Sequence, residues 1–222
     1  MQHDQTTRML WLVGLFSVAM GFLEAAVVVY LRLHFHPAGF GFPLAPMPGW
    51  VVGVEVAREA ATIVMLVCVG WISGRSFLGR FAYFAYAFAV WDIFYYVFLK
   101  LVLDWPESLL TTDVLFLIPF PWIAPVLAPV VCSIALIVAS IIVVRRESQG
   151  SPVTMRPLHW AGIVTGGVVM LISFLLDTGA ALRQEMPAPF PWLLFGAGFL
   201  VAVIAFFSGL SRVRQPQPAD RR

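Results

Sequence analysis

Three charged side chains lie within an apolar stretch that otherwise predicts a membrane-spanning helix at about residues 50–72. They are Glu55, Arg58 and Glu59. One ionised side chain at the centre of a bilayer costs about 2.5–3.5 kcal/mol on insertion scales, so these groups need partners, water or a proton. Spacings of three and four residues place all three near one face of a helix. Arg58 can neutralise only one of the two carboxylates, so at least one negative charge remains.

Other polar groups are expected at a similar depth in the neighbouring predicted helices. Counting about 1.5 Å per residue from the outer helix ends places the group at depths of roughly 8–18 Å. We therefore predict one ligand- or ion-binding site formed by Glu24, Glu55, Arg58, Glu59, Asp92 and Tyr96. Four acids facing one arginine predict either protonated carboxylates or a bound cation. The alternative is that a Glu–Arg pair only holds two helices together.

Other chemistries find little support in the sequence. A phosphate-binding glycine loop, a CxxC pair, an HExxH motif and a nucleophile elbow are all absent. Cys68 and Cys132 each lie in an apolar run without a second Cys or a His nearby, which predicts neither a disulfide nor a zinc site. His34 and His36 leave metal binding in the first loop open. No cofactor or catalytic residue is assigned, and whether the protein is an enzyme stays undecided.

The composition predicts an all-α integral membrane protein. Of the 222 residues, 60% are hydrophobic and 12% charged, against about 25% charged in soluble domains. Apolar runs predict about six transmembrane helices, at about residues 9–33, 50–72, 81–103, 122–144, 158–182 and 192–210. Residues 108–118 follow Pro106 and predict a short interfacial or re-entrant helix. Residues 1–211 would then form one transmembrane domain, and residues 212–222 a disordered cytoplasmic tail.

Three similar Pro-x-Pro motifs suggest an arrangement of three hairpins. They end at Trp50, Trp122 and Trp192, each just before a predicted helix that runs inward, although proline at helix starts and interfacial tryptophan also explain the pattern. Most arginines lie at the termini and in the loops that follow the second and fourth predicted helices. Loops rich in arginine usually face the cytoplasm, so both termini are predicted to lie there. Lys100 is the only lysine and asparagine is absent. This bias suggests a GC-rich bacterial genome and hence the inner membrane.

Three functions remain open on the sequence. We expect a small proton- or cation-linked transporter or permease-like protein that uses the carboxylate cluster. The first alternative is a membrane-embedded enzyme, or a protein that binds quinone or lipid, with its site facing the outer leaflet. The second is an accessory subunit of a membrane complex, with small-residue stripes such as Gly162 and Gly166 as partner contacts. The expected partners are the lipid bilayer and a small molecule or cation; the small net charge of +2 suggests no nucleic acid.

Overall fold

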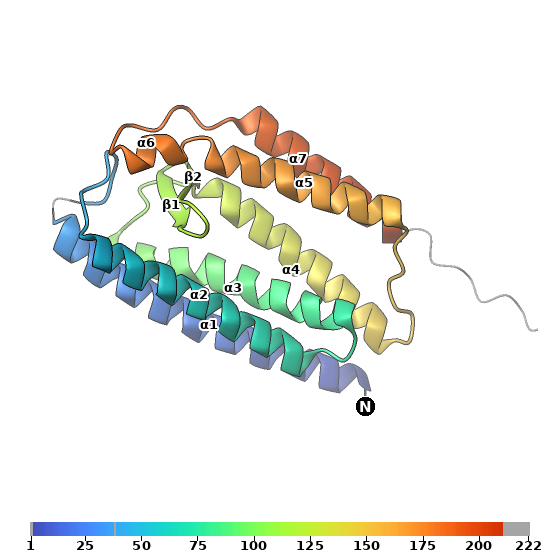
Figure 1. Ribbon diagram of the computed structural model, residues 1–222. Helices are drawn as coiled ribbons and strands as arrows, with labels where there is room; N and C mark the ends of the chain where they lie inside the picture. Colours follow the sequence, from blue (N-terminus) through green and yellow to red (C-terminus); the bar gives the residue numbers. More distant parts are fainter. Residues whose placement is uncertain (1, 38, 211–222) are drawn as a thin grey trace, which may run out of the picture.

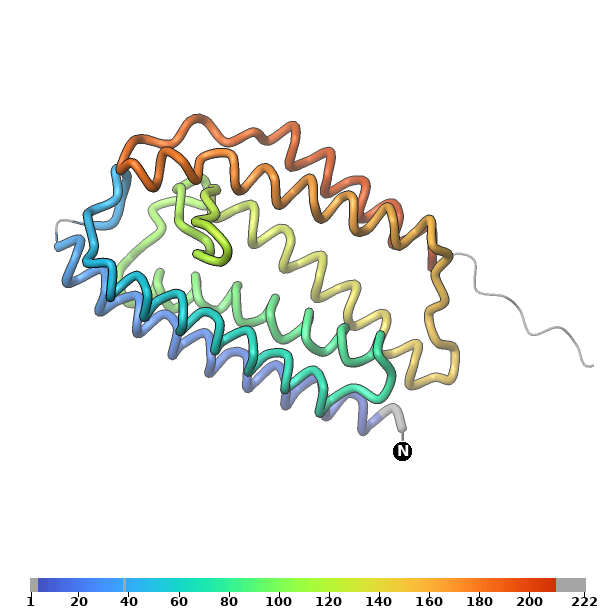
Figure 2. The backbone as a smooth tube through the Cα atoms, viewed as in Figure 1, coloured from blue at the N-terminus to red at the C-terminus, as the bar shows by residue number. Residues whose placement is uncertain are grey.

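The computed structural model describes residues 2–37 and 39–210, which form long helices running between two ends of the molecule (Figure 1). In chain order the elements are α1 (Gln2–Phe35), α2 (Gly49–Ser73), α3 (Phe77–Leu103), β1 (Thr112–Phe116), β2 (Trp122–Pro125), α4 (Leu127–Ser148), α5 (Pro157–Leu175), α6 (Thr178–Leu182) and α7 (Trp192–Leu210). The tail predicted at residues 212–222 lies outside the described residues. Figure 2 shows the chain passing back and forth between the two ends.

Five helical segments of the described chain are long and apolar enough to span a membrane. They are α1, α3, α4, α5 continued through α6, and α7. α2 is 25 residues long but is not among them, and it carries Glu55, Arg58 and Glu59 in its first half. The structure therefore supports a multi-pass membrane protein, while the expected six spans are not confirmed.

α3 lies at the centre of the bundle formed by α1 to α4. It packs against α1, α2 and α4, whereas α1 and α2 make few direct contacts with each other. Small residues allow this close packing: Ala82, Ala85 and Ala89 of α3 are buried, and a Cβ added at Gly70 of α2 would lie 2.7 Å from the carbonyl oxygen of Arg80. Because the first two helices meet mainly through α3, the expected arrangement of consecutive hairpins is not confirmed.

α5 and α7 form a separate pair along one side of the bundle (Figure 1). A Cβ added at Gly166 would lie 2.5 Å from the carbonyl oxygen of Gly198, and one added at Gly162 would lie 2.6 Å from Cβ of Ala205. The small-residue stripe of α5 is therefore occupied by α7 of the same chain. These glycines give no support to a contact with another protein.

The segment expected to be a short helix at residues 108–118 contains a β-strand instead. β1 pairs with β2 in an antiparallel hairpin, with Asp113 opposite Ala124 and Val114 opposite Ile123. The turn between the strands contains Pro119 and Pro121, which do not fit a helix interior. Because Trp122 begins a strand, the second Pro-x-Pro motif does not precede a helix, and the predicted three-fold repeat fails there. The fold is thus helical with one small sheet, not all-α.

The two ends of the bundle differ in charge. The start of α1 and the α2–α3 and α4–α5 connections, with the helix turns next to them, lie at one end and carry Arg8, Arg75, Arg80, Arg145, Arg146 and Arg156 (Figure 1). The hairpin and the loop residues 36–37 and 39–48 lie toward the opposite end, with Arg32 and Lys100. This end also holds the predicted carboxylate site.

Candidate functional site

All six predicted site residues line one cavity of about 170 Å³, called the acid cavity below. Its walls come from α1, α2 and α3, from the loop at residues 36–47 and from β1 with the residue after it. The charged or titratable lining residues are Glu24, Arg32, His36, Glu55, Arg58, Glu59, Asp92, Tyr95, Tyr96 and Asp113. The residues predicted from neighbouring helices therefore share one space, and additional charged groups join them.

Arg58 connects the first two helices by ion pairs. Its Nε and Nη2 atoms lie 2.9 and 2.8 Å from Oε2 of Glu55 on the same helix, and its Nη1 atom pairs with Oε1 of Glu24 on α1. Thr62 donates a 3.5 Å hydrogen bond to the other oxygen of Glu24. A guanidinium bound by two carboxylates has most of its donors satisfied. Because α1 and α2 otherwise touch little, this triad supplies their principal direct connection.

Glu59 has a different partner although it follows Arg58 directly. Its Oε2 atom accepts a 2.8 Å hydrogen bond from the backbone N–H of Leu117, just after β1. The residue is only 7% exposed, and it forms no ion pair with a described cation. A buried carboxylate without a cationic partner is costly when ionised. Glu59 therefore both positions the hairpin and provides a group that favours a proton or a bound cation.

Asp92 lines the acid cavity but is hydrogen-bonded to α4 and not to Arg58. Its Oδ2 atom accepts a 2.9 Å hydrogen bond from the hydroxyl of Ser133. Within the described residues it has no ion pair. The structure therefore does not join all four predicted acids to one arginine: Glu24 and Glu55 bind Arg58, while Glu59 and Asp92 accept hydrogen bonds from uncharged donors.

Tyr96 belongs to a second charged group that the sequence did not reveal. Its hydroxyl donates a 3.2 Å hydrogen bond to Oδ2 of Asp113, whose Oδ1 atom is 3.1 Å from Nη2 of Arg32. The Arg32 guanidinium lies between two rings, 4.0 Å from the centroid of Phe40 and 3.7 Å from that of Trp105. Its Nη1 atom is buried without a hydrogen-bond partner in the described chain.

The missed residues had weak signals in the sequence. Arg32 ends an apolar run, where an arginine usually marks membrane orientation, and Asp113 is 81 residues away. Ser133 and Thr62 are single hydroxyls within helices. The one other signal is that the loop around Phe40 is rich in aromatic residues, which indicates that this loop packs against the helices beneath it.

The acid cavity carries more acids than bases. Glu24, Glu55, Glu59, Asp92 and Asp113 face Arg32 and Arg58, so five negative charges against two positive ones leave three in excess if all are ionised. Partial burial, with the nearby charge of Arg32, lowers the pKa of His36, so this imidazole does not offset the excess near neutral pH. The cavity thus favours protons or a positively charged guest.

The carboxylates are distributed around the cavity and do not converge on one point. Among the described residues, no group of three or more His, Cys, Asp or Glu side chains has the geometry of a metal site. His34 is exposed and makes an edge-to-face contact with Phe35, while His36 lines the cavity and contacts Phe40. The donors suit several waters, a monovalent cation or an ammonium group better than a tightly held divalent ion.

Comparison of the chain with models of protein families, with curated proteins and with solved structures finds no match. The functional argument therefore rests on the residues of this chain and on their geometry.

Proposed function

We propose that this protein is a small proton- or cation-linked transporter of the bacterial inner membrane, with both termini in the cytoplasm and the acid cavity as its ion site. The observation that carries the proposal is the excess of carboxylates over arginines in the acid cavity, and in particular the lack of a cationic partner for Glu59 and Asp92. Groups of this kind bind a proton or a cation because either one removes the cost of a buried charge.

The size of the cavity favours a small guest. Its volume of about 170 Å³ is below the roughly 300–1,000 Å³ typical of pockets for drug-sized ligands. It has room for several water molecules. A proton carried through water, a monovalent cation or a small ammonium compound fits better than a quinone ring or a whole lipid headgroup.

A second cavity of about 600 Å³ lies at the arginine-rich end of the same bundle. Tyr83 lines this cavity and Trp91 lines the acid cavity, and both belong to one hydrophobic cluster together with fully buried Leu66 and Ala87. In alternating access, a binding site opens first to one side of the membrane and then to the other. An apolar layer between the two cavities fits this mechanism, because the acid cavity connects with the other side only when that layer opens.

Flux measurements in proteoliposomes test the proposal. Wild-type protein should dissipate an imposed pH gradient, or exchange a monovalent cation or methylammonium for protons, and Glu59→Gln and Asp92→Asn should each reduce this flux at least about tenfold. Glu185→Gln is the matched control, because Glu185 is exposed and pairs with Arg183 outside the cavity. Flux in both cavity variants equal to that of wild type would rule the proposal out.

A second candidate is a membrane-embedded enzyme, or a protein that binds quinone or lipid at the outer leaflet. The unpartnered Nη1 atom of Arg32 favours it, because a buried guanidinium with a free donor suits a carboxylate or phosphate. A quinone or lipid retained through purification and lost in Arg32→Gln, together with absent flux, would favour this candidate over transport.

A further inference from the structure

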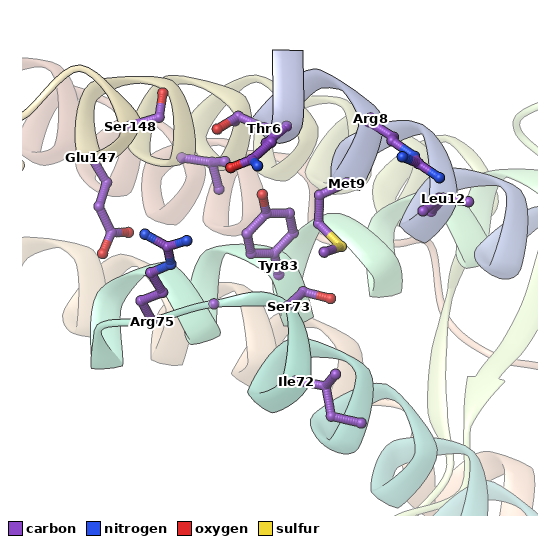
Figure 3. Close-up of a pocket in the computed structure, with 13 residues that line it drawn as sticks. Thr6, Arg8, Met9, Leu12, Ile72, Ser73, Arg75, Tyr83, Glu147 and Ser148 are labelled. Atoms are coloured by element: carbon purple, nitrogen blue, oxygen red, sulfur yellow. The ribbon is translucent and has the colours of Figure 1, made fainter. Parts of the chain in front are cut away.

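The larger cavity, called the arginine cavity below, has a chemistry opposite to that of the acid cavity. It lies between the start of α1, the end of α2, the first turns of α3 and the end of α4 (Figure 3). Its charged lining residues are Arg8, Arg75 and Glu147, so two positive charges against one negative leave one positive charge. The other arginines at this end of the molecule add to the positive field.

Tyr83 is a mostly buried side chain that lines the cavity. The residue is 5% exposed, and no hydrogen bond joins its hydroxyl to another described residue. In Figure 3 its ring lies in the middle of the lining side chains, close to Thr6 and Arg75. A hydroxyl that reaches a cavity without a protein partner can donate a hydrogen bond to a ligand there.

Arg75 is a cation that lines the cavity together with Tyr83. Figure 3 shows its guanidinium extending between Glu147 and Tyr83. Neither Arg75 nor Arg8 forms an ion pair with another described residue. Glu147 does not pair with them either: its Oε2 atom lies so close to Gly79 that an added Cβ there would be 2.2 Å away. The carboxylate thus lies against the first turn of α3, whose backbone N–H groups partly offset its charge.

The same cavity has apolar walls. Met9 and Leu12 of α1, Ile72 of α2 and Val144 of α4 line it beside the polar groups. Basic pockets between membrane helices at the cytoplasmic side commonly bind the headgroups of anionic lipids, with the acyl chains along the helices. A cavity with charge on one side and hydrocarbon on the other matches an amphiphile of this kind.

We propose that the arginine cavity binds a phosphate group, with Arg75 and Tyr83 as the principal contacts and an anionic phospholipid as the source. Arg75 supplies forked N–H donors to the phosphate oxygens, and the Tyr83 hydroxyl donates a further hydrogen bond. The apolar residues contact the first part of the acyl chains. This site is distinct from the acid cavity, and it does not depend on the function proposed for that cavity.

Two probes distinguish a lipid from a soluble phosphate compound. Native mass spectrometry counts phosphatidylglycerol bound to protein in nanodiscs with a phosphatidylcholine background, and thermal unfolding in detergent follows a titration with inorganic phosphate. Arg75→Gln should weaken phosphatidylglycerol binding about tenfold, and Arg75→Lys should weaken it less because the charge stays. Tyr83→Phe tests the hydroxyl separately if Arg75→Gln proves unstable, and it should also weaken binding.

The matched control is Arg145→Gln, because Arg145 is exposed at the same end of the bundle and does not line the cavity. An effect of phosphatidylglycerol alone supports the lipid, and stabilisation by inorganic phosphate that disappears in Arg75→Gln supports the same site with a soluble ligand. Equal losses in Arg145→Gln and Arg75→Gln would mean general attraction of lipid to a basic surface and would overturn the proposal. So would binding that is unchanged in Arg75→Gln and Tyr83→Phe.

Discussion

The two ends of the α1–α4 bundle use charge in opposite ways. In the acid cavity the charged side chains are largely satisfied by other protein groups: Arg58 by two carboxylates, Arg32 by Asp113, and Glu59 and Asp92 by hydrogen bonds. In the arginine cavity, Arg75 forms no ion pair and the Tyr83 hydroxyl no hydrogen bond within the described chain. Charge in the acid cavity therefore holds helices together at Arg58 and leaves Glu59 and Asp92 for the proposed ion site, while charge in the arginine cavity takes little part in holding the fold.

α2 shows the same difference along a single helix. Its buried residues toward the acid cavity include Glu55, Glu59 and Thr62, while toward the arginine cavity they are Leu66 and Gly70. Hydrogen bonds and ion pairs thus position one half of the helix, and close apolar packing positions the other. Substitutions matched between the two ends test this difference.

The largest effect is expected from removing Arg58. Arg58→Ala leaves the half-buried Glu24 and the buried Glu55 without their cation and should lower the free energy of unfolding by about 3–5 kcal/mol. Arg58→Lys should restore part of it, because one ammonium cannot reproduce the forked contacts. Arg75→Ala at the other end should change stability by no more than about 0.5 kcal/mol. Unfolding in detergent measures both, and equal losses for Arg58→Ala and Arg75→Ala would contradict the comparison.

Glycine substitutions test the packing of α2. Gly70→Ala adds a Cβ 2.7 Å from the Arg80 carbonyl oxygen and 2.8 Å from the backbone of Phe84, so the two helices must move apart. We expect a loss of about 1–3 kcal/mol. Gly53→Ala in the other half of α2 meets nothing within 4 Å and should be neutral, or stabilising by up to about 1 kcal/mol. Thermal unfolding of the two variants side by side decides, and a destabilising Gly53→Ala would show that this half is also closely packed.

Two tyrosines of α3 offer a finer comparison. Tyr96→Phe removes the hydrogen bond to Asp113 and should cost about 1 kcal/mol, because the buried carboxylate loses a donor. Tyr83→Phe removes a hydroxyl with no protein partner and should leave the stability of the lipid-free protein unchanged. Chemical unfolding in detergent after lipid removal measures both. A cost for Tyr83→Phe equal to that for Tyr96→Phe would indicate a protein partner for the Tyr83 hydroxyl.

The sequence predicted the helices and part of the site, for separate physical reasons. Long apolar runs gave the helices, and the spacing of Glu55, Arg58 and Glu59 predicted a shared face, because both are local properties of the chain. The direction of Asp92 could not be predicted, since α3 has small residues on several faces and offers close approach to more than one neighbour. The Arg32–Asp113 pair depends on a hairpin that folds back between the helices. No local period in the sequence specifies such a contact.

The smallest expected effect concerns His36 at the rim of the acid cavity. Partial burial, with the nearby charge of Arg32, lowers the pKa of this imidazole in the folded protein below its ordinary value of 6.5. The unfolded chain then binds a proton more readily than the folded one, so stability is highest above pH 6.5 and falls as the pH decreases through and below that value.

His36→Gln should therefore show a shallower loss of stability on acidification. His34→Gln, in an exposed position nearby, is the control and should keep the wild-type profile. Melting temperatures across this pH range measure the effect. A His36→Gln profile parallel to that of wild type would mean that partial burial and the nearby charge of Arg32 do not oppose protonation of His36.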